Sequence, residues 1–252
     1  MKAVYFDCFS GASGDMLLGA LIDCGLDERH FVSELQKMPL SGWRLRTEKV
    51  KRYGLAAVDL HIDIEEQKVV RHLPDIFKLV DESALEPEVK EKSVRVFENL
   101  ARAEAKVHGV EMDKVHFHEV GAVDSIIDIV GTVLALHLLK VEKIYASALP
   151  LGHGKVKTEH GLIPVPVPAT LALLQQHGKV PVYSAGIEGE MVTPTGAALL
   201  TTLVEEFGQM PAMELEVVGC GSGKRDYGYP NIVRAIIGEL AEKKSTAAKA
   251  SV

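Results

Sequence analysis

The sequence has few cysteines and few aromatic residues, and each shortage excludes a class of protein. The 252 residues include three cysteines, Cys8, Cys24 and Cys220, which are far apart and odd in number. They form neither a CxxC metal-binding pair nor a disulfide framework, so a reducing cytoplasm is the expected location. Aromatic residues make up 6% of the chain and do not alternate with Lys and Arg, so no nucleic-acid-binding surface is indicated.

The chain also lacks an excess of positive charge and a long apolar run. Its net charge of -7 argues against non-specific binding to nucleic acid. The most apolar segment, residues 126–139, is shorter than the roughly 20 residues that span a bilayer, and it contains Asp128 and His137. The N-terminal MKAVYFD has no signal-peptide apolar region. We therefore expect a soluble protein with no nucleic-acid or membrane partner.

Strand and helix patterns mix along the whole chain, which predicts an α/β or α+β fold with helices packed on a mixed sheet. A central buried helix is expected over residues 124–139. Other predicted helices cover residues 15–23, 28–37, 73–81, 87–107, 170–176 and 194–207. Predicted strands cover residues 3–6, 43–49, 56–64, 144–149, 214–218 and 232–237, with an extended segment over 150–168. Residues 1–240 are expected to form one metal-binding domain, followed by a disordered tail over 241–252.

The segment VHFHEVGAVDSIIDIVG, residues 115–131, combines imidazole and carboxylate groups. His116 and His118 alternate, so in an extended chain both point to the same side, and Glu119 follows directly. Asp124 and Asp128 are four apart, which places both on one helical face. This ligand set suits nickel, zinc or manganese. The alternative is that Asp124 caps the helix and the histidines lie on the surface.

Asp128 is harder to explain as an ordinary acid. It lies between Ile127 and Ile129 in a helix that should be buried on most sides. An ionised carboxylate there costs several kcal/mol unless a cation, a basic group or hydrogen-bond donors compensate it. The metal interpretation is therefore favoured for the segment as a whole.

The loop in VYFDCFSGASGDM follows a predicted strand and precedes a predicted helix, a place where backbone N–H groups can hold phosphate. It lacks the P-loop lysine and the full dinucleotide-binding glycine pattern. Asp7 and Asp15 flank the loop and would repel phosphate unless a cation lay between them. A metal or metal–phosphate site is one interpretation, and a capped turn with Asp15 in the first helical turn is the other.

Three further segments give weaker signals. GHGKVKTEHG could be a substrate loop or a polar hairpin tip, and GEMVTPTGA places Thr193 and Thr195 at a helix start. GCGSGKRDYGYPN is a glycine-rich loop with Lys224 and Arg225 at a small cationic tip. None of these patterns identifies a function alone.

Five motifs taken together resemble the nickel insertion proteins of nickel-pincer cofactor biosynthesis. They are DCFSGASGDM, HFHEVGAVDSIIDIVG, GHGKVKTEHGLIPVPVPAT, EMVTPTGAALL and GSGKRDYGYPNIVR, in this order over residues 1–238. The resemblance implies a nickel insertase, an enzyme of the lyase class. It would insert Ni²⁺ into pyridinium-3,5-bisthiocarboxylic acid mononucleotide, forming carbon–nickel and sulfur–nickel bonds. The mature cofactor serves enzymes such as lactate racemase.

The resemblance also implies roles for particular residues. Exchangeable His and carboxylate ligands suit a protein that must hand nickel on. The expected metal ligands are Asp7, Asp15, His116, His118, Glu119, Asp124 and Asp128. Breaking the substrate's C–H bond requires a proton acceptor, which could be His116, His118 or Glu119. The expected cofactor-binding residues, near the mononucleotide phosphate, are Ser10, Gly11, Ser13, Gly14, Thr193 and Thr195.

Members of the family continue past the PNIVR segment into a C-terminal domain associated with CTP, whereas this sequence runs into the predicted tail. The resemblance thus implies that CTP, with Mn²⁺ or Mg²⁺, acts through such a domain or a separate second subunit. Homo-oligomers are also expected. Two alternatives remain open: a nickel delivery protein without catalysis, and a metal-dependent phosphohydrolase. Against the second, Phe9 stands where the haloacid-dehalogenase pattern requires a second aspartate.

Overall fold

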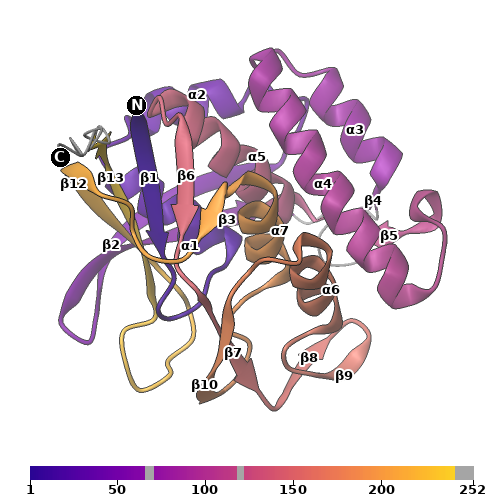
Figure 1. Cartoon of the computed structure of the whole chain (residues 1–252). Helices are drawn as coiled ribbons and strands as arrows, with labels where there is room; N and C mark the ends of the chain where they lie inside the picture. Colours follow the sequence, from indigo (N-terminus) through magenta and orange to yellow (C-terminus); the bar gives the residue numbers. More distant parts are fainter. Residues whose placement is uncertain (66–70, 118–121, 242–252) are drawn as a thin grey trace, which may run out of the picture.

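The computed structural model describes residues 1–65, 71–117 and 122–241. Its largest element is a mixed seven-stranded sheet with the strand order β11-β6-β1-β13-β12-β3-β2 (Figure 1). β1 is parallel to β6 and antiparallel to β13. The strands are β1 (Lys2–Asp7), β2 (Trp43–Arg52), β3 (Leu55–Ile64), β6 (Lys143–Ala146), β11 (Glu206–Phe207), β12 (Met213–Ser222) and β13 (Ile232–Leu240). The predicted α/β class is confirmed.

Seven helices are present in the described part of the chain. α1 packs on the sheet against β3, β12 and β13, and α5 packs on α1, with α4, α6 and α7 beyond it (Figure 1). Their bounds are α1 (Gly14–Asp23), α2 (Glu28–Leu35), α3 (Leu73–Asp81), α4 (Pro87–His108), α5 (Val123–Leu138), α6 (Pro168–His177) and α7 (Pro194–Leu203). The hydrophobic core fills the space between these layers, and α5, which the sequence predicts as buried, lies inside it.

Local signals explain several helix boundaries. The Asp27 side chain caps α2 by accepting hydrogen bonds from the backbone amides of Arg29 and His30. α4 begins with Pro87 and ends at Gly109, which adopts a left-handed conformation (φ 65°). The predicted bounds of α4 are confirmed to within one residue, whereas the helix predicted over 28–37 ends at Leu35.

α1 approaches the sheet very closely because β12 contains glycines. A Cβ atom at Gly221 would lie 1.8 Å from the carbonyl oxygen of Met16 in α1, and one at Gly219 would lie 2.2 Å from that of Ala20. Side chains at these positions would push the helix away from the sheet. These glycines, predicted to begin a loop over 219–231, instead belong to β12 and fix the position of α1, and with it that of Asp15.

Several sequence predictions need correction. The helix expected over 194–207 ends at Leu203, and Glu206–Phe207 pairs with β6 as an edge strand. The segment expected to be only extended, 150–168, contains β7 (Leu149–His153) and the hairpin β8 (Lys155–Thr158) with β9 (Gly161–Pro164). β10 (Val182–Glu188), parallel to β7, is absent from the sequence prediction. Two short strands, β4 (Arg71–His72) and β5 (His116–Phe117), pair with each other, and η1 (Met112–Lys114) is a 3₁₀ turn. The predicted disordered tail lies largely outside the described residues.

Candidate functional site: an acidic cavity at the start of α1

Three of the predicted metal ligands line one cavity. It has a volume of about 220 Å³ and is bordered by the carboxylates of Asp15, Asp124 and Asp128 and by Lys224. Leu60 and Ile62 of β3 form part of its wall and are not themselves polar. α1 and α5 supply the acids, and the loop between β12 and β13 supplies the lysine. We call this space the acidic cavity.

Asp128 is the most unusual group in the acidic cavity. Its Oδ1 atom is buried and has no hydrogen-bond partner among the described residues. Burial raises the pKa of this carboxyl well above its ordinary value, and the charges of Asp15 and Asp124 raise it further. Lys224 and a hydrogen bond from the backbone N–H of Asp15 oppose the shift only in part. The Oδ1 atom is buried, as expected, whereas the residue as a whole is half-buried.

Asp15 connects the acids to the lysine. Its Oδ2 lies 3.2 Å from Nζ of Lys224, while its Oδ1 accepts hydrogen bonds from Ser13 Oγ and from the backbone N–H of Met16, the latter at 3.0 Å. Burial lowers the pKa of Lys224, but the carboxylates of Asp15, Asp128 and Asp59 outweigh it, so the pKa lies above its ordinary value. Lys224 is therefore a cation held at the mouth of a carboxylate-lined space.

The glycine–serine loop is shaped to let the acids meet. A Cβ atom at Gly14 would lie 2.7 Å from both Cβ and Oδ2 of Asp128, so only glycine fits there without displacing the carboxylate. Gly11 donates to the Cys8 carbonyl at 2.8 Å, and Ala12 donates to the Met191 carbonyl at 2.9 Å. Those two amides are consequently already bonded within the protein.

The other predicted cofactor-binding residues divide between the cavity and its surroundings. Ser13, Gly14, Thr193 and Thr195 line the acidic cavity, and the Thr193 side chain also caps α7 by accepting from the Gly196 amide at 3.2 Å. Ser10 lies elsewhere, with its hydroxyl donating to the Pro230 carbonyl at 2.6 Å.

Asp124 does not cap α5. The cap residue is Ala122, and Asp124 lies in the first turn, where its Oδ1 accepts from the Ser125 amide at 2.8 Å. The alternative interpretation of Asp124 as the N-cap is therefore wrong. Its carboxylate, largely exposed, remains at the edge of the acidic cavity.

Asp7 lies apart from the other carboxylates. It does not border the acidic cavity and forms an ion pair with Arg234 on the neighbouring strand β13. The guanidinium of Arg234 also lies 5.8 Å from the ring centroid of Phe9. A role of Asp7 as a metal ligand stays a prediction, and it would require this ion pair to open.

The histidine segment is described only in part. The backbone of His116 pairs with His72 between β5 and β4. His118 and Glu119 lie outside the described residues. Within the described residues, no group of three or more His, Cys, Asp or Glu side chains is arranged to hold a metal ion. The three cavity carboxylates alone thus do not form a complete ligand set.

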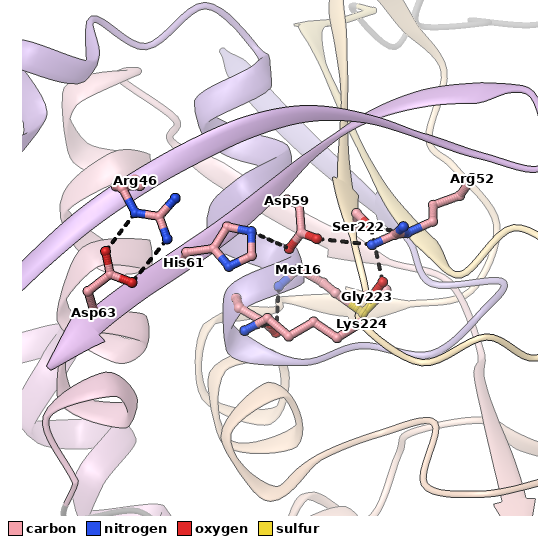
Figure 2. Close-up of polar contacts among 10 residues, drawn as sticks. Met16, Arg46, Arg52, Asp59, His61, Asp63, Ser222, Gly223 and Lys224 are labelled. Atoms are coloured by element: carbon pink, nitrogen blue, oxygen red, sulfur yellow. Dashed lines mark hydrogen bonds and ion pairs between the residues drawn. The ribbon is translucent and has the colours of Figure 1, made fainter.

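A polar network beside the cavity holds the lysine-bearing loop, and sequence reasoning missed it. Asp59, nearly buried on β3, accepts from Arg52 at 3.0 Å, and the same guanidinium donates to Ser222 Oγ at 2.8 Å (Figure 2). Ser222 in turn donates to the Gly223 carbonyl at 3.0 Å, next to Lys224. His61 Nε2 lies 3.7 Å from Asp59 (Figure 2). The sequence signal was the charged residue Asp59 between the apolar Val58 and Leu60.

The chain is thus an α/β protein in which three carboxylates and a lysine border one cavity. The chain belongs to the nickel insertion protein family, whose model matches residues 4–252. It is 49% identical to the pyridinium-3,5-bisthiocarboxylic acid mononucleotide nickel insertion protein of Desulfitobacterium hafniense, over 96% of this chain and 60% of that protein. It is 45% identical to the protein of the same name from Staphylococcus epidermidis, over 93% of this chain and 59% of that protein.

The chain spans about three fifths of the length of the curated relatives it matches. No solved structure is significantly similar to it. Across the described residues, none of the helices has both the length and the apolar character needed to cross a bilayer.

Proposed function

We propose that this chain carries the nickel-inserting function of its family and acts on pyridinium-3,5-bisthiocarboxylic acid mononucleotide. The observation that carries the proposal is the buried, unpartnered Oδ1 of Asp128 beside Asp15 and Asp124. A divalent cation would neutralise these charges where the protein itself supplies only Lys224. The names of the relatives from Desulfitobacterium hafniense and Staphylococcus epidermidis support nickel as this cation and the mononucleotide as its acceptor.

The chemistry requires ligands that release nickel and a base that accepts a proton. Forming the carbon–nickel bond breaks a ring C–H bond, and the proton must go to a group on the protein while nickel stays divalent. We assign nickel binding to Asp15, Asp124 and Asp128, completed by His116, His118 and Glu119 from the segment before α5. One of these last three is the proton acceptor. Carboxylate and imidazole ligands exchange more readily than a thiolate cage, which suits transfer to the substrate's sulfur atoms.

The hydroxyl groups of the cavity suit the reacting end of the substrate. Ser13, Thr193 and Thr195 line the space beside the acids and can donate hydrogen bonds to thiocarboxylate groups. Consumption of CTP with Mn²⁺ or Mg²⁺ is assigned to a C-terminal domain or second subunit. The three free cysteines support a cytoplasmic location. The product would be the cofactor of lactate racemase-type enzymes.

Cofactor formation tests the proposal. The chain is incubated with Ni²⁺ and the bisthiocarboxylate mononucleotide, with and without CTP and the C-terminal part of a relative, and the product is followed by mass spectrometry. We expect the nickel-containing product when all components are present. Nickel binding without product in any mixture would favour a delivery protein. Phosphate release from generic phosphoesters would favour the phosphohydrolase alternative.

A second experiment addresses the histidine segment. Replacing His116 and His118 together by Ala should weaken nickel binding strongly, because imidazole is the nitrogen ligand that this site offers. If the nickel affinity measured by calorimetry is unchanged in the double variant, neither histidine is a nickel ligand.

A further inference from the structure

A second cavity lies on the other side of Lys224 and is lined by positive charge. Its volume is about 260 Å³, and Lys51, Arg52, Lys224 and Arg225 border it. Four cationic side chains in one cavity are unusual in a chain whose net charge is -7. We call this space the basic cavity.

The acid that borders the basic cavity is already engaged. Asp226 Oδ1 accepts from the Tyr53 hydroxyl at 2.5 Å and from the Gly228 amide at 2.9 Å. Arg52 is shared with Asp59, at 3.0 Å. Neither Lys51 nor Arg225 forms an ion pair with any residue in the described ranges. Lys51 and Arg225 therefore bring positive charge to the basic cavity that no carboxylate in the described ranges neutralises.

The wall of this cavity also contains a strained residue. Tyr53 has φ 49°, in the left-handed region, at the turn between β2 and β3, where Asn or Gly is favoured. The residue is 56% exposed, so packing does not explain the choice of tyrosine. Its hydroxyl instead joins the turn to the loop between β12 and β13 through Asp226. Strained backbone conformations of this kind cluster at ligand-binding and catalytic positions.

The two cavities have linings of opposite charge. A phosphate monoester carries close to two negative charges, which the acidic cavity would repel and the basic cavity would attract. Lys224 borders both cavities, so one molecule with a phosphate at one end and metal-binding groups at the other can occupy them together. The exposed ring of Tyr53, with Tyr229, gives the connecting sugar and ring an apolar surface.

We propose that the basic cavity binds the phosphate group of a pyridinium mononucleotide whose ring reaches the acidic cavity. The inference rests on the proposed function, which supplies the mononucleotide as substrate. It places the phosphate on Lys51 and Arg225 rather than on the loop at Gly11–Gly14, two of whose amides are already bonded. Lys224 then lies between the phosphate and the nickel ligands.

Binding to the metal-free chain tests the inference without requiring nickel insertion. The probes are pyridinium-3-carboxylic acid mononucleotide, the corresponding nucleoside without phosphate, and inorganic phosphate, each titrated by calorimetry. We expect the mononucleotide to bind at least about tenfold more tightly than the nucleoside, because charge-assisted hydrogen bonds to phosphate contribute that much or more. Its affinity should fall as the salt concentration rises.

Variants identify the cavity. Lys51→Gln with Arg225→Gln should lower mononucleotide affinity about 10- to 100-fold, while nucleoside and Ni²⁺ affinities stay as in the wild type. Unchanged nickel binding also shows that the double variant is folded. Lys155→Gln, on the exposed strand β8, removes a positive charge that borders neither cavity and should have no effect.

Two results would overturn the inference. One is equal affinity for mononucleotide and nucleoside, or no measurable binding of either. The other is a double variant that binds the mononucleotide as the wild type does. If nickel insertion fails but phosphate-dependent binding follows the expected pattern, the proposed function is at fault and the phosphate site stands.

Discussion

Asp128 has the most perturbed carboxyl group of the acidic cavity. Its Oδ1 is buried and has no partner within the described residues, and the charges of Asp15 and Asp124 add to the effect of burial on its pKa. The sequence could predict burial around this carboxyl group, because its neighbours are Ile127 and Ile129. It could not predict Lys224 as the nearest cation, because that contact depends on how the loop between β12 and β13 folds over α1.

We predict that Asp128→Asn stabilises the metal-free protein at neutral pH and abolishes nickel binding. The folded-state pKa of Asp128 is raised, so its contribution to the free energy of unfolding is present below the unfolded-state pKa and lost as pH rises through the folded-state value. The variant has no such titration. The free energy of unfolding of the wild type minus that of the variant should therefore fall as pH rises, by at most about 1.4 kcal/mol per pH unit.

Denaturant unfolding at several pH values measures this difference, with nickel affinity determined on the same samples. A difference that does not change with pH would mean that Asp128 titrates normally. Nickel affinity equal to that of the wild type would make Asp128 a structural acid.

Gly14 provides a steric test of the same carboxylate. Gly14→Ala would place a Cβ atom 2.7 Å from Asp128 Oδ2, so the carboxylate must move. We expect nickel affinity to fall about tenfold and stability by roughly 1–3 kcal/mol. Gly131→Ala is the control, because its Cβ atom would contact the flexible end of Leu18 at 2.9 Å and should leave nickel affinity unchanged. Equal nickel affinity in both variants would contradict the role given to Gly14.

At the scale of elements, periodicity and capping signals predict most helices and strands. α3, α4 and α5 agree with the sequence prediction to within one residue at each end, because their apolar stripes are clear. β10 and the correct end of α7 could not be predicted, because β10 is mostly exposed and β11 is defined by pairing with β6. The division of the site residues between a cavity and its surroundings likewise depends on tertiary packing.

The β2–β3 hairpin offers a prediction about the network in Figure 2. Replacing Arg52 by Met leaves the Asp59 carboxylate, whose side chain is 8% exposed, without its cation. We expect a loss of roughly 2–3 kcal/mol in unfolding free energy, because a buried charge loses its partner. Arg46→Met breaks the exposed pair with Asp63 on the same hairpin and should cost much less, because solvent screens that pair. Similar losses in the two variants would show that burial of Asp59 does not decide the energy.

At the scale of the whole molecule, nickel should stabilise the folded chain. Binding to the native state at 100 times the Kd adds about 2.7 kcal/mol to the free energy of unfolding, provided that the unfolded chain does not bind. We predict a clear rise in melting temperature with Ni²⁺ that is lost in the combined variant Asp15→Asn with Asp128→Asn. A rise that persists in this variant would place the binding site elsewhere, for example among exposed histidines.

The central claim is that nickel binds in the acidic cavity between α1 and α5. Crystals of the chain soaked in Ni²⁺ and measured at the nickel absorption edge test it most directly, because anomalous scattering locates the metal itself. We expect one strong peak within ligand distance of carboxylate oxygens of Asp128 and Asp15, with Lys224 moved away from Asp15. A nickel peak at another site, with the acidic cavity empty and the Lys224–Asp15 ion pair intact, would contradict it.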